Sequence, residues 1–120
     1  MISIIIKTFN EEKNIEGCIS SCINVIKKFG GEIILIDSLS DDKTIEITKK
    51  YDIQIYQIKE KNLRSTGLAQ IGYKYSRYEY LLLVDGDMIL NENFIHEALK
   101  EFNNPDVAGV SGIIKEKASN

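Results

Sequence analysis

The sequence predicts an open, doubly wound α/β fold, in which a mostly parallel sheet has helices on both faces. Short apolar runs recur along the chain, as in strands that are buried on both sides. Amphipathic helical segments separate these runs, so the expected order is β-α-β-α-β-α-β-α-β. Right-handed crossovers turn such an order into a parallel sheet covered by helices.

Five segments have strand character. Residues 2–6, 33–36 and 80–84 are continuous apolar runs, rich in isoleucine and leucine. A shorter strand of alternating type is expected over residues 53–58. A final strand is expected over residues 107–114.

The intervening segments have helical periodicity. From Ile15 to residue 26 the apolar positions follow the i, i+3, i+4 spacing of one helix face, and Gly30–Gly31 supplies a stop. Asp41 or Asp42 is expected to cap a short second helix that runs to residue 50.

Two further helices are expected nearer the end of the chain. The third contains Leu68, Ile71 and Tyr75. Asn91 is expected to cap a fourth, whose apolar face runs from Phe94 to residue 102.

Length and charge exclude several classes of protein. The 120 residues suffice for one compact domain, expected over residues 1–120. The formal net charge of -3 argues against a nucleic-acid partner, which would need a basic face. No apolar run is long enough to span a bilayer or to act as a signal peptide. A cytoplasmic location is expected, and a peripheral site at the inner membrane face stays open.

The sharpest chemical feature is an Asp-Gly-Asp sequence at the end of a predicted strand. In doubly wound sheets, ligands bind beyond the carboxyl ends of the strands. Asp85 and Asp87 can there reach one divalent cation, and Gly86 allows a ligand to approach closely. A chance Asp-x-Asp in a surface turn is the alternative, which the position after a buried strand disfavours.

Three segments together resemble family 2 glycosyltransferases. Residues 3–15 are similar to the family's opening strand, Pro-Thr-Tyr-Asn-Glu motif and following helix. Residues 34–44 resemble its strand followed by Asp-Asp/Ser-Gly-Ser-Thr-Asp-Gly-Thr, and residues 82–87 match its Asp-x-Asp. The resemblance covers nearly the whole chain and implies the GT-A fold, the Rossmann-like sheet of nucleotide-diphospho-sugar transferases.

The resemblance implies an inverting glycosyltransferase that moves a sugar from a nucleotide-diphosphate sugar to an acceptor hydroxyl. A divalent metal, Mn²⁺ or Mg²⁺, is implied at Asp87 and Asp85, and Asp37 is implied as a contact to the base. The acceptor, whether a saccharide, a lipid or a protein, stays open. The nucleotide-sugar-binding residues that follow from the matched motifs are Thr8, Phe9, Glu11, Asp37, Ser38, Asp85, Gly86 and Asp87.

The chain departs from the family pattern at several positions. Lys7 replaces the usual proline and brings a cation near the phosphate site. Leu39 and Lys43 stand where the family tends to have glycine, so a left-handed backbone is not expected there. The family's arginine before the fourth strand is missing from residues 68–72, and Arg64, one helical turn earlier, is the candidate substitute.

The resemblance also implies a limit to what this chain does alone. The family's general base is expected beyond residue 120, so the chain is expected to carry the donor and metal half and to transfer sugar poorly. Exposed strand edges are expected to favour self-association. The alternatives are a non-catalytic nucleotide-binding remnant and, remotely, a Mg²⁺-dependent phosphatase of the haloacid dehalogenase type.

Overall fold

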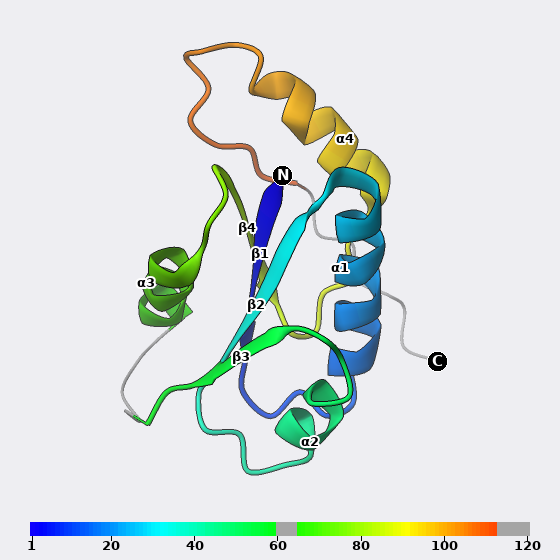
Figure 1. Ribbon diagram of the computed structural model, residues 1–120, viewed down its shortest axis with the longest axis vertical. Helices are drawn as coiled ribbons and strands as arrows, with labels where there is room; N and C mark the ends of the chain where they lie inside the picture. Colours follow the sequence, from blue (N-terminus) through cyan, green and yellow to red (C-terminus); the bar gives the residue numbers. More distant parts are fainter. Residues whose placement is uncertain (60–64, 113–120) are drawn as a thin grey trace. The chain divides into compact units, whose positions relative to one another are not determined.

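The computed structural model describes residues 1–59 and 65–112 of the chain, with residues 65 and 66 described by their backbone only (Figure 1). The chain divides into two compact units, Met1–Leu90 and Asn91–Asn120, which are described separately below.

The first unit contains a four-stranded parallel sheet. Its strands are β1 (Ile2–Thr8), β2 (Gly31–Asp37), β3 (Gln54–Gln57) and β4 (Tyr80–Asp85), in the order β3-β2-β1-β4. The four strands predicted within residues 1–90 are therefore confirmed. The chain winds outward from β1 to β3 and then crosses back to place β4 on the other side of β1. The strand order thus reverses between β1 and β4, where doubly wound sheets bind their ligands.

Helices cover both faces of this sheet, as predicted. α1 (Ile15–Phe29) and α2 (Thr44–Thr48) lie on one face, and α3 (Ser65–Tyr75) lies on the other (Figure 1). The predicted cap of α2 at Asp41 or Asp42 is wrong, because the capping position is Lys43 and its side chain makes no capping hydrogen bond. Asp42, one residue earlier, still accepts a hydrogen bond at Oδ1 from Thr44 N at 2.9 Å. No helix in residues 1–59 and 65–112 is long and apolar enough to cross a membrane.

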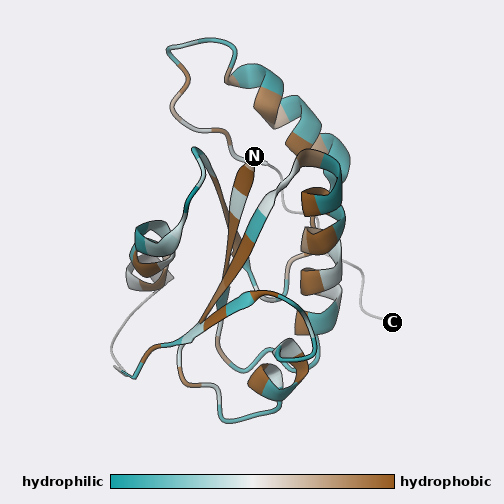
Figure 2. Ribbon diagram, viewed as in Figure 1, coloured by the Kyte–Doolittle hydropathy of each residue, from teal (hydrophilic) through white to brown (hydrophobic). Residues whose placement is uncertain are grey.

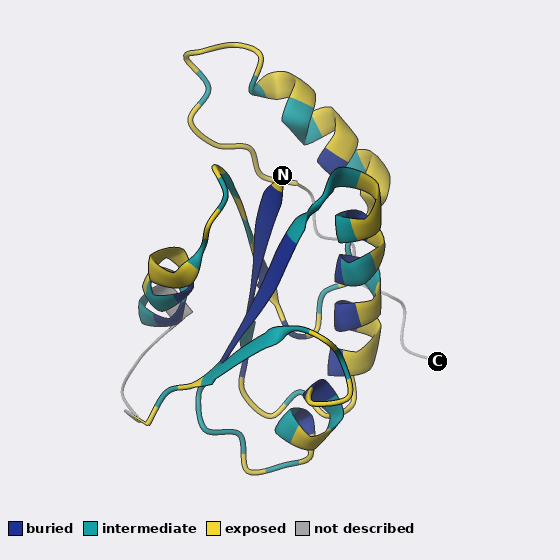
Figure 3. Cartoon of the chain, in the orientation of Figure 1, coloured by how far each residue is buried: buried dark blue, intermediate teal, exposed yellow. Residues whose placement is uncertain are grey.

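The core lies between β1, β2 and their covering helices. The apolar residues of α1 turn toward the sheet, and the two central strands are the most buried elements (Figures 2 and 3). The fully buried apolar residues of β1 and β2 are Ile4, Ile5, Ile6, Ile34, Leu35 and Ile36. Burial on both faces explains why these strands read as continuous apolar runs.

A polar cluster closes the amino end of the sheet. Glu32 of β2 is buried, and its carboxylate accepts hydrogen bonds from the Ser3 hydroxyl at 2.8 Å and from Arg77 N at 2.7 Å. Gln54 Nε2 and Arg77 Nε donate to its other oxygen, each at 3.1 Å. One carboxylate therefore connects three strands and the segment before β4.

The second unit contains α4 (Glu92–Glu101), which begins as predicted. The Asn91 side chain accepts hydrogen bonds from the backbone N–H groups of Asn93 and Phe94, at 2.8 and 3.4 Å. The strand predicted over residues 107–114 is wrong for residues 107–112, which are neither strand nor helix. Gly109 and Gly112 weaken strand formation in this stretch, and most of its side chains are exposed.

Candidate functional site

A cavity of about 700 Å³ lies at the carboxyl edge of the sheet, where β1 and β4 meet. The residues that line it come from the ends of these strands, from the loops after β1, β2 and β4, and from α3. They are Lys7, Thr8, Phe9, Glu11, Ser38, Leu39, Asp41, Leu68, Asp85, Gly86 and Asp87. Seven of the nine nucleotide-sugar-binding residues predicted from the sequence are therefore brought together. Of the other two, Arg64 lies outside the described residues, and Asp37 is considered below.

The two last residues of β1 point to opposite faces of the sheet. Lys7 shares its face with Ile5, and Ile5 is the residue that a Cβ on Gly72 of α3 would meet, so this face is the one that α3 covers. Lys7 pairs in register with Asp85 of β4, and Lys7 Nζ lies 3.3 Å from Asp85 Oδ1. The Lys7 side chain is only 16% exposed, whereas that of Asp85 is 59% exposed.

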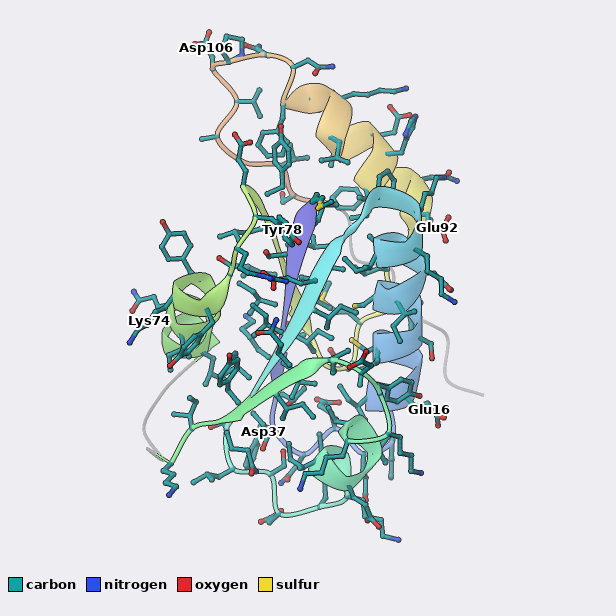
Figure 4. The ribbon with its side chains drawn as sticks, in the orientation of Figure 1. Glu16, Asp37, Lys74, Tyr78, Glu92 and Asp106 are labelled. Carbon is teal, nitrogen blue, oxygen red and sulfur yellow. The ribbon has the colours of Figure 1, made fainter. Side chains whose placement is uncertain are left out.

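Thr8 points to the other face and holds Asp37. Thr8 Oγ1 donates to Asp37 Oδ1 at 2.7 Å, and the Ser40 hydroxyl donates to the same oxygen at 2.6 Å. Asp37 Oδ2 accepts from Ser40 N at 2.8 Å and from Gln57 Nε2 at 3.5 Å. Asp37 is fully buried and is not among the lining residues. The structure thus does not bring Asp37 to the cavity with Asp85 and Asp87, because protein donors occupy both of its oxygens; Figure 4 labels its position.

Hydrogen bonds join the loop after β1 to the loop after β2. Asn10 N donates to Ser40 Oγ at 2.8 Å, and Asp41 N donates to Asn10 Oδ1 at 2.9 Å. Glu11 N donates to Thr44 Oγ1 at 2.8 Å, so the first residue of α2 is also connected. Asn10 therefore has a structural role, connecting the two loops, for which its short polar side chain is well suited.

Two residues in these loops adopt left-handed backbone. Asn10 and Leu39 each have φ of 52°. The expectation that Leu39 would avoid this region is wrong, whereas Lys43 does have a negative φ of -84°. The bonds from Ser40 to Asp37 hold the backbone just after Leu39, which explains how a residue with a Cβ is kept there.

The turn after β4 presents the two predicted metal ligands to solvent. Gly86 N donates to Lys7 O at 3.0 Å, and Met88 N donates to Asp85 O at 2.9 Å. A Cβ on Gly86 would lie 2.8 Å from Thr8 Cγ2, so glycine allows this turn to pack closely against β1. Both Asp85 and Asp87 are exposed beside the cavity.

The donor set fits a divalent cation shared with a phosphate ligand. Residues 1–59 and 65–112 contain no group of three His, Cys, Asp or Glu side chains that would hold a metal by themselves. Mg²⁺ is commonly held by one or two carboxylates, with phosphate oxygens and water completing its octahedron. Asp85 and Asp87 match that partial set.

Comparison with known proteins identifies the family. The profile of glycosyl transferase family 2 matches residues 3–120. The chain belongs to glycosyl transferase family 2. This family 2 chain is 30% identical to poly(ribitol-phosphate) beta-N-acetylglucosaminyltransferase TarP of Staphylococcus aureus, over 93% of the chain and 37% of TarP. It is also 30% identical to dolichyl N-acetyl-alpha-D-glucosaminyl phosphate 3-beta-D-2,3-diacetamido-2,3-dideoxy-beta-D-glucuronosyltransferase of Methanococcus voltae, over 99% of the chain and 40% of that protein.

Solved structures confirm the fold of the family 2 chain. Residues 1–349 of S. aureus TarS superpose with a TM-score of 0.73 at 24% identity, covering 85% of this chain and 32% of that one. A glucosyl-3-phosphoglycerate synthase from Mycobacterium tuberculosis gives a TM-score of 0.69 at 18% identity, covering 87% and 39%. The predicted GT-A fold is therefore shown. The chain spans about two fifths or less of the length of these proteins.

Proposed function

We propose that the chain binds the nucleoside diphosphate of a sugar donor, with Mn²⁺ or Mg²⁺, as the donor part of an inverting glycosyltransferase. The observation that carries the proposal is the cavity between β1 and β4, which combines two exposed carboxylates with the exposed ring of Phe9. Its volume of about 700 Å³ lies within the usual range for small-molecule sites. Membership of the family supports the same assignment.

The lining residues divide into two groups by chemistry. Phe9, 56% exposed, offers a flat apolar surface for the base, and Thr8, Glu11 and Ser38 supply polar atoms around the nucleoside. In this proposal Asp37 acts through Thr8 and Ser40, which it orients, and does not touch the base.

The second group belongs to the diphosphate. Asp87 and Asp85 would hold the cation, and Gly86 lets the turn that carries them pack against β1 beside the cavity. When bound, the cation supplies Lewis-acid stabilisation of the charge on the departing diphosphate.

The reaction proposed for the whole enzyme is a single displacement. The acceptor hydroxyl gives its proton to a base, and its oxygen bonds to the anomeric carbon of the sugar. The bond from that carbon to the phosphate oxygen breaks on the opposite side, and its electron pair leaves with the diphosphate. The base is not assigned to any described residue.

A binding titration tests this proposal. The chain is titrated calorimetrically with UDP, GDP, CDP and TDP, first with excess Mn²⁺ and then with EDTA. We expect one of these nucleotides to bind with Mn²⁺, and Asp87→Asn to weaken that binding at least about tenfold because a charge-assisted contact is lost. Asp106→Asn removes an exposed carboxylate that does not line the cavity and serves as the control. Failure of all four nucleotides to bind in Mn²⁺ would contradict the proposal.

The cellular location is part of the same proposal. We expect the chain in the cytoplasmic fraction, with attachment to the inner membrane face as the alternative. Fractionation in low and high salt distinguishes the two, because peripheral electrostatic attachment is weakened by salt.

A further inference from the structure

Among the described residues that line the cavity, Lys7 is the single cation. Four carboxylates share the lining with it, those of Glu11, Asp41, Asp85 and Asp87, which leaves a formal charge of -3 around the cavity. A divalent cation alone would not neutralise this lining, and a nucleoside diphosphate brings further negative charge. The positive charge of Lys7 therefore opposes the repulsion that a diphosphate meets on entry.

The position of Lys7 suits a contact with an anionic ligand. Its side chain is largely buried, and Lys7 lines the cavity together with Asp85, the residue beside which its ammonium lies. The register of β1 and β4 places it opposite Asp85, with 3.3 Å between Nζ and Oδ1. Because the Asp85 side chain is 59% exposed, the ion pair is screened by water and is easily exchanged for another anion.

We propose that Lys7 is a phosphate-binding residue, whose ammonium moves from Asp85 to the pyrophosphate of the donor and gives binding that needs no divalent cation. Lysine binds phosphate as a point charge, without the fixed geometry that arginine requires. The exchange also releases Asp85 as a ligand for the cation. Lys7 and the metal thus interact with the same two partners, a carboxylate and a phosphate. This inference rests on the proposed function, because it assumes that a nucleoside diphosphate enters this cavity.

The test compares the wild type with Lys7→Met, which keeps the unbranched side chain as far as Cε and removes its charge. One assay titrates the nucleotide that binds best in Mn²⁺ into protein in EDTA. We expect Lys7→Met to bind at least about tenfold more weakly, because a charge-assisted contact is lost. Lys7→Arg retains the charge and should keep most of this metal-free binding. Lys49→Met removes an exposed lysine that does not line the cavity and should leave it unchanged.

A second assay titrates Mn²⁺ alone and follows the loss of the free-ion signal by electron paramagnetic resonance. Here we expect Lys7→Met to bind Mn²⁺ about threefold or more tightly, because the ammonium no longer competes for Asp85. If Lys7 only stabilised the turn, its replacement would weaken both nucleotide and metal binding. Opposite changes in the two assays therefore support the phosphate-binding role.

Three results would overturn it: no binding by the wild type in EDTA, equal binding by Lys7→Met in EDTA, or weaker Mn²⁺ binding by that variant. Each of these leaves the proposed function standing if the wild type binds the nucleotide in Mn²⁺. Absence of binding in Mn²⁺ contradicts the proposed function itself. Circular dichroism and the thermal midpoint confirm that each variant is folded; if Lys7→Met is unfolded, Lys7→Gln replaces it with the same expected results.

Discussion

Thr8 Oγ1 and Asp37 Oδ1 lie 2.7 Å apart across β1 and β2, in a position where neither residue is more than 2% exposed. A buried carboxylate whose donor is removed loses a hydrogen bond that water cannot replace. We expect Thr8→Val, which keeps the shape of the side chain, to lower the free energy of unfolding by about 1–3 kcal/mol. Urea denaturation measures this change. The exposed Ser20→Ala is the control, and an unchanged midpoint for Thr8→Val would show that the bond contributes nothing.

Gly86 provides the close packing of the turn after β4. A Cβ at this position would lie 2.8 Å from Thr8 Cγ2 and 3.1 Å from Glu11 Cγ. We expect Gly86→Ala to cost about 1–3 kcal/mol of stability, because the turn and β1 must move apart. Gly109→Ala is a matched control, since its Cβ would meet nothing within 4 Å. Thermal unfolding compares the two, and equal midpoints would contradict the packing role of Gly86.

Glu32 makes folding stability depend on pH. Burial alone would raise the pKa of its carboxyl, but the hydrogen bonds from Arg77, Ser3 and Gln54 outweigh burial, and the net result is a pKa below the usual 4.5. A carboxyl with a lowered folded-state pKa contributes stability that is fully present above the unfolded-state value and is lost as the pH falls through the folded one. We expect the urea concentration at the unfolding midpoint to decrease as the pH is lowered from neutral into the acid range. In Glu32→Gln this decrease should be smaller.

The control for this prediction is Glu46→Gln, an exposed residue of α2. It should reproduce the wild-type dependence on pH. If Glu32→Gln shows the same acid slope as the wild type, the cluster at the amino end of the sheet does not titrate as proposed.

The left-handed backbone at Leu39 should distinguish between side chains. The left-handed conformation costs most residues with a Cβ about 1–2 kcal/mol of folding stability, but asparagine adopts it at a lower cost. We expect Leu39→Asn to be as stable as the wild type or slightly more stable, and the β-branched Leu39→Ile to be destabilised by about 1 kcal/mol or more. Both are measured by urea denaturation. Equal stability of the two variants would argue against a left-handed residue at this position.

β4 is an edge strand of the sheet in the part of the chain that the structure describes. Its Leu81 and Leu83 are 38% and 51% exposed, and an exposed apolar edge favours pairing with another chain. We expect sedimentation velocity to show concentration-dependent self-association, and Leu83→Lys to reduce it. Tyr73→Lys changes another exposed apolar residue, on α3, and should have a smaller effect. A monomer at every concentration would contradict this prediction.

The arrangement of strands and helices could be predicted because burial dominates this fold. The residues of β1 and β2 are buried on both faces, so both strands appear in the sequence as continuous apolar runs. Residues 107–112 form no strand, because two valines among small residues satisfy a strand pattern without enough apolar surface to bury.

The site could be predicted in part. Asp85 is the last residue of β4 and Asp87 lies two residues further on, and that position alone places them at the carboxyl edge. The burial of Asp37 could not be predicted, because one carboxylate after a strand can face a ligand or accept bonds from its own chain. The pairing of Lys7 with Asp85 depends on the register of strands far apart in the sequence, and no local signal specifies it.

The last two residues of β1 interact with the two neighbouring strands: Lys7 forms an ion pair with β4, and Thr8 donates a hydrogen bond to β2. Deleting or inserting one residue within this strand would exchange the faces, sending the ammonium toward α1 and the hydroxyl toward α3. A substitution at the last residues of β1 therefore changes only the local charge or hydrogen bonding of the cavity, whereas a change in the length of the strand would disrupt the cavity itself.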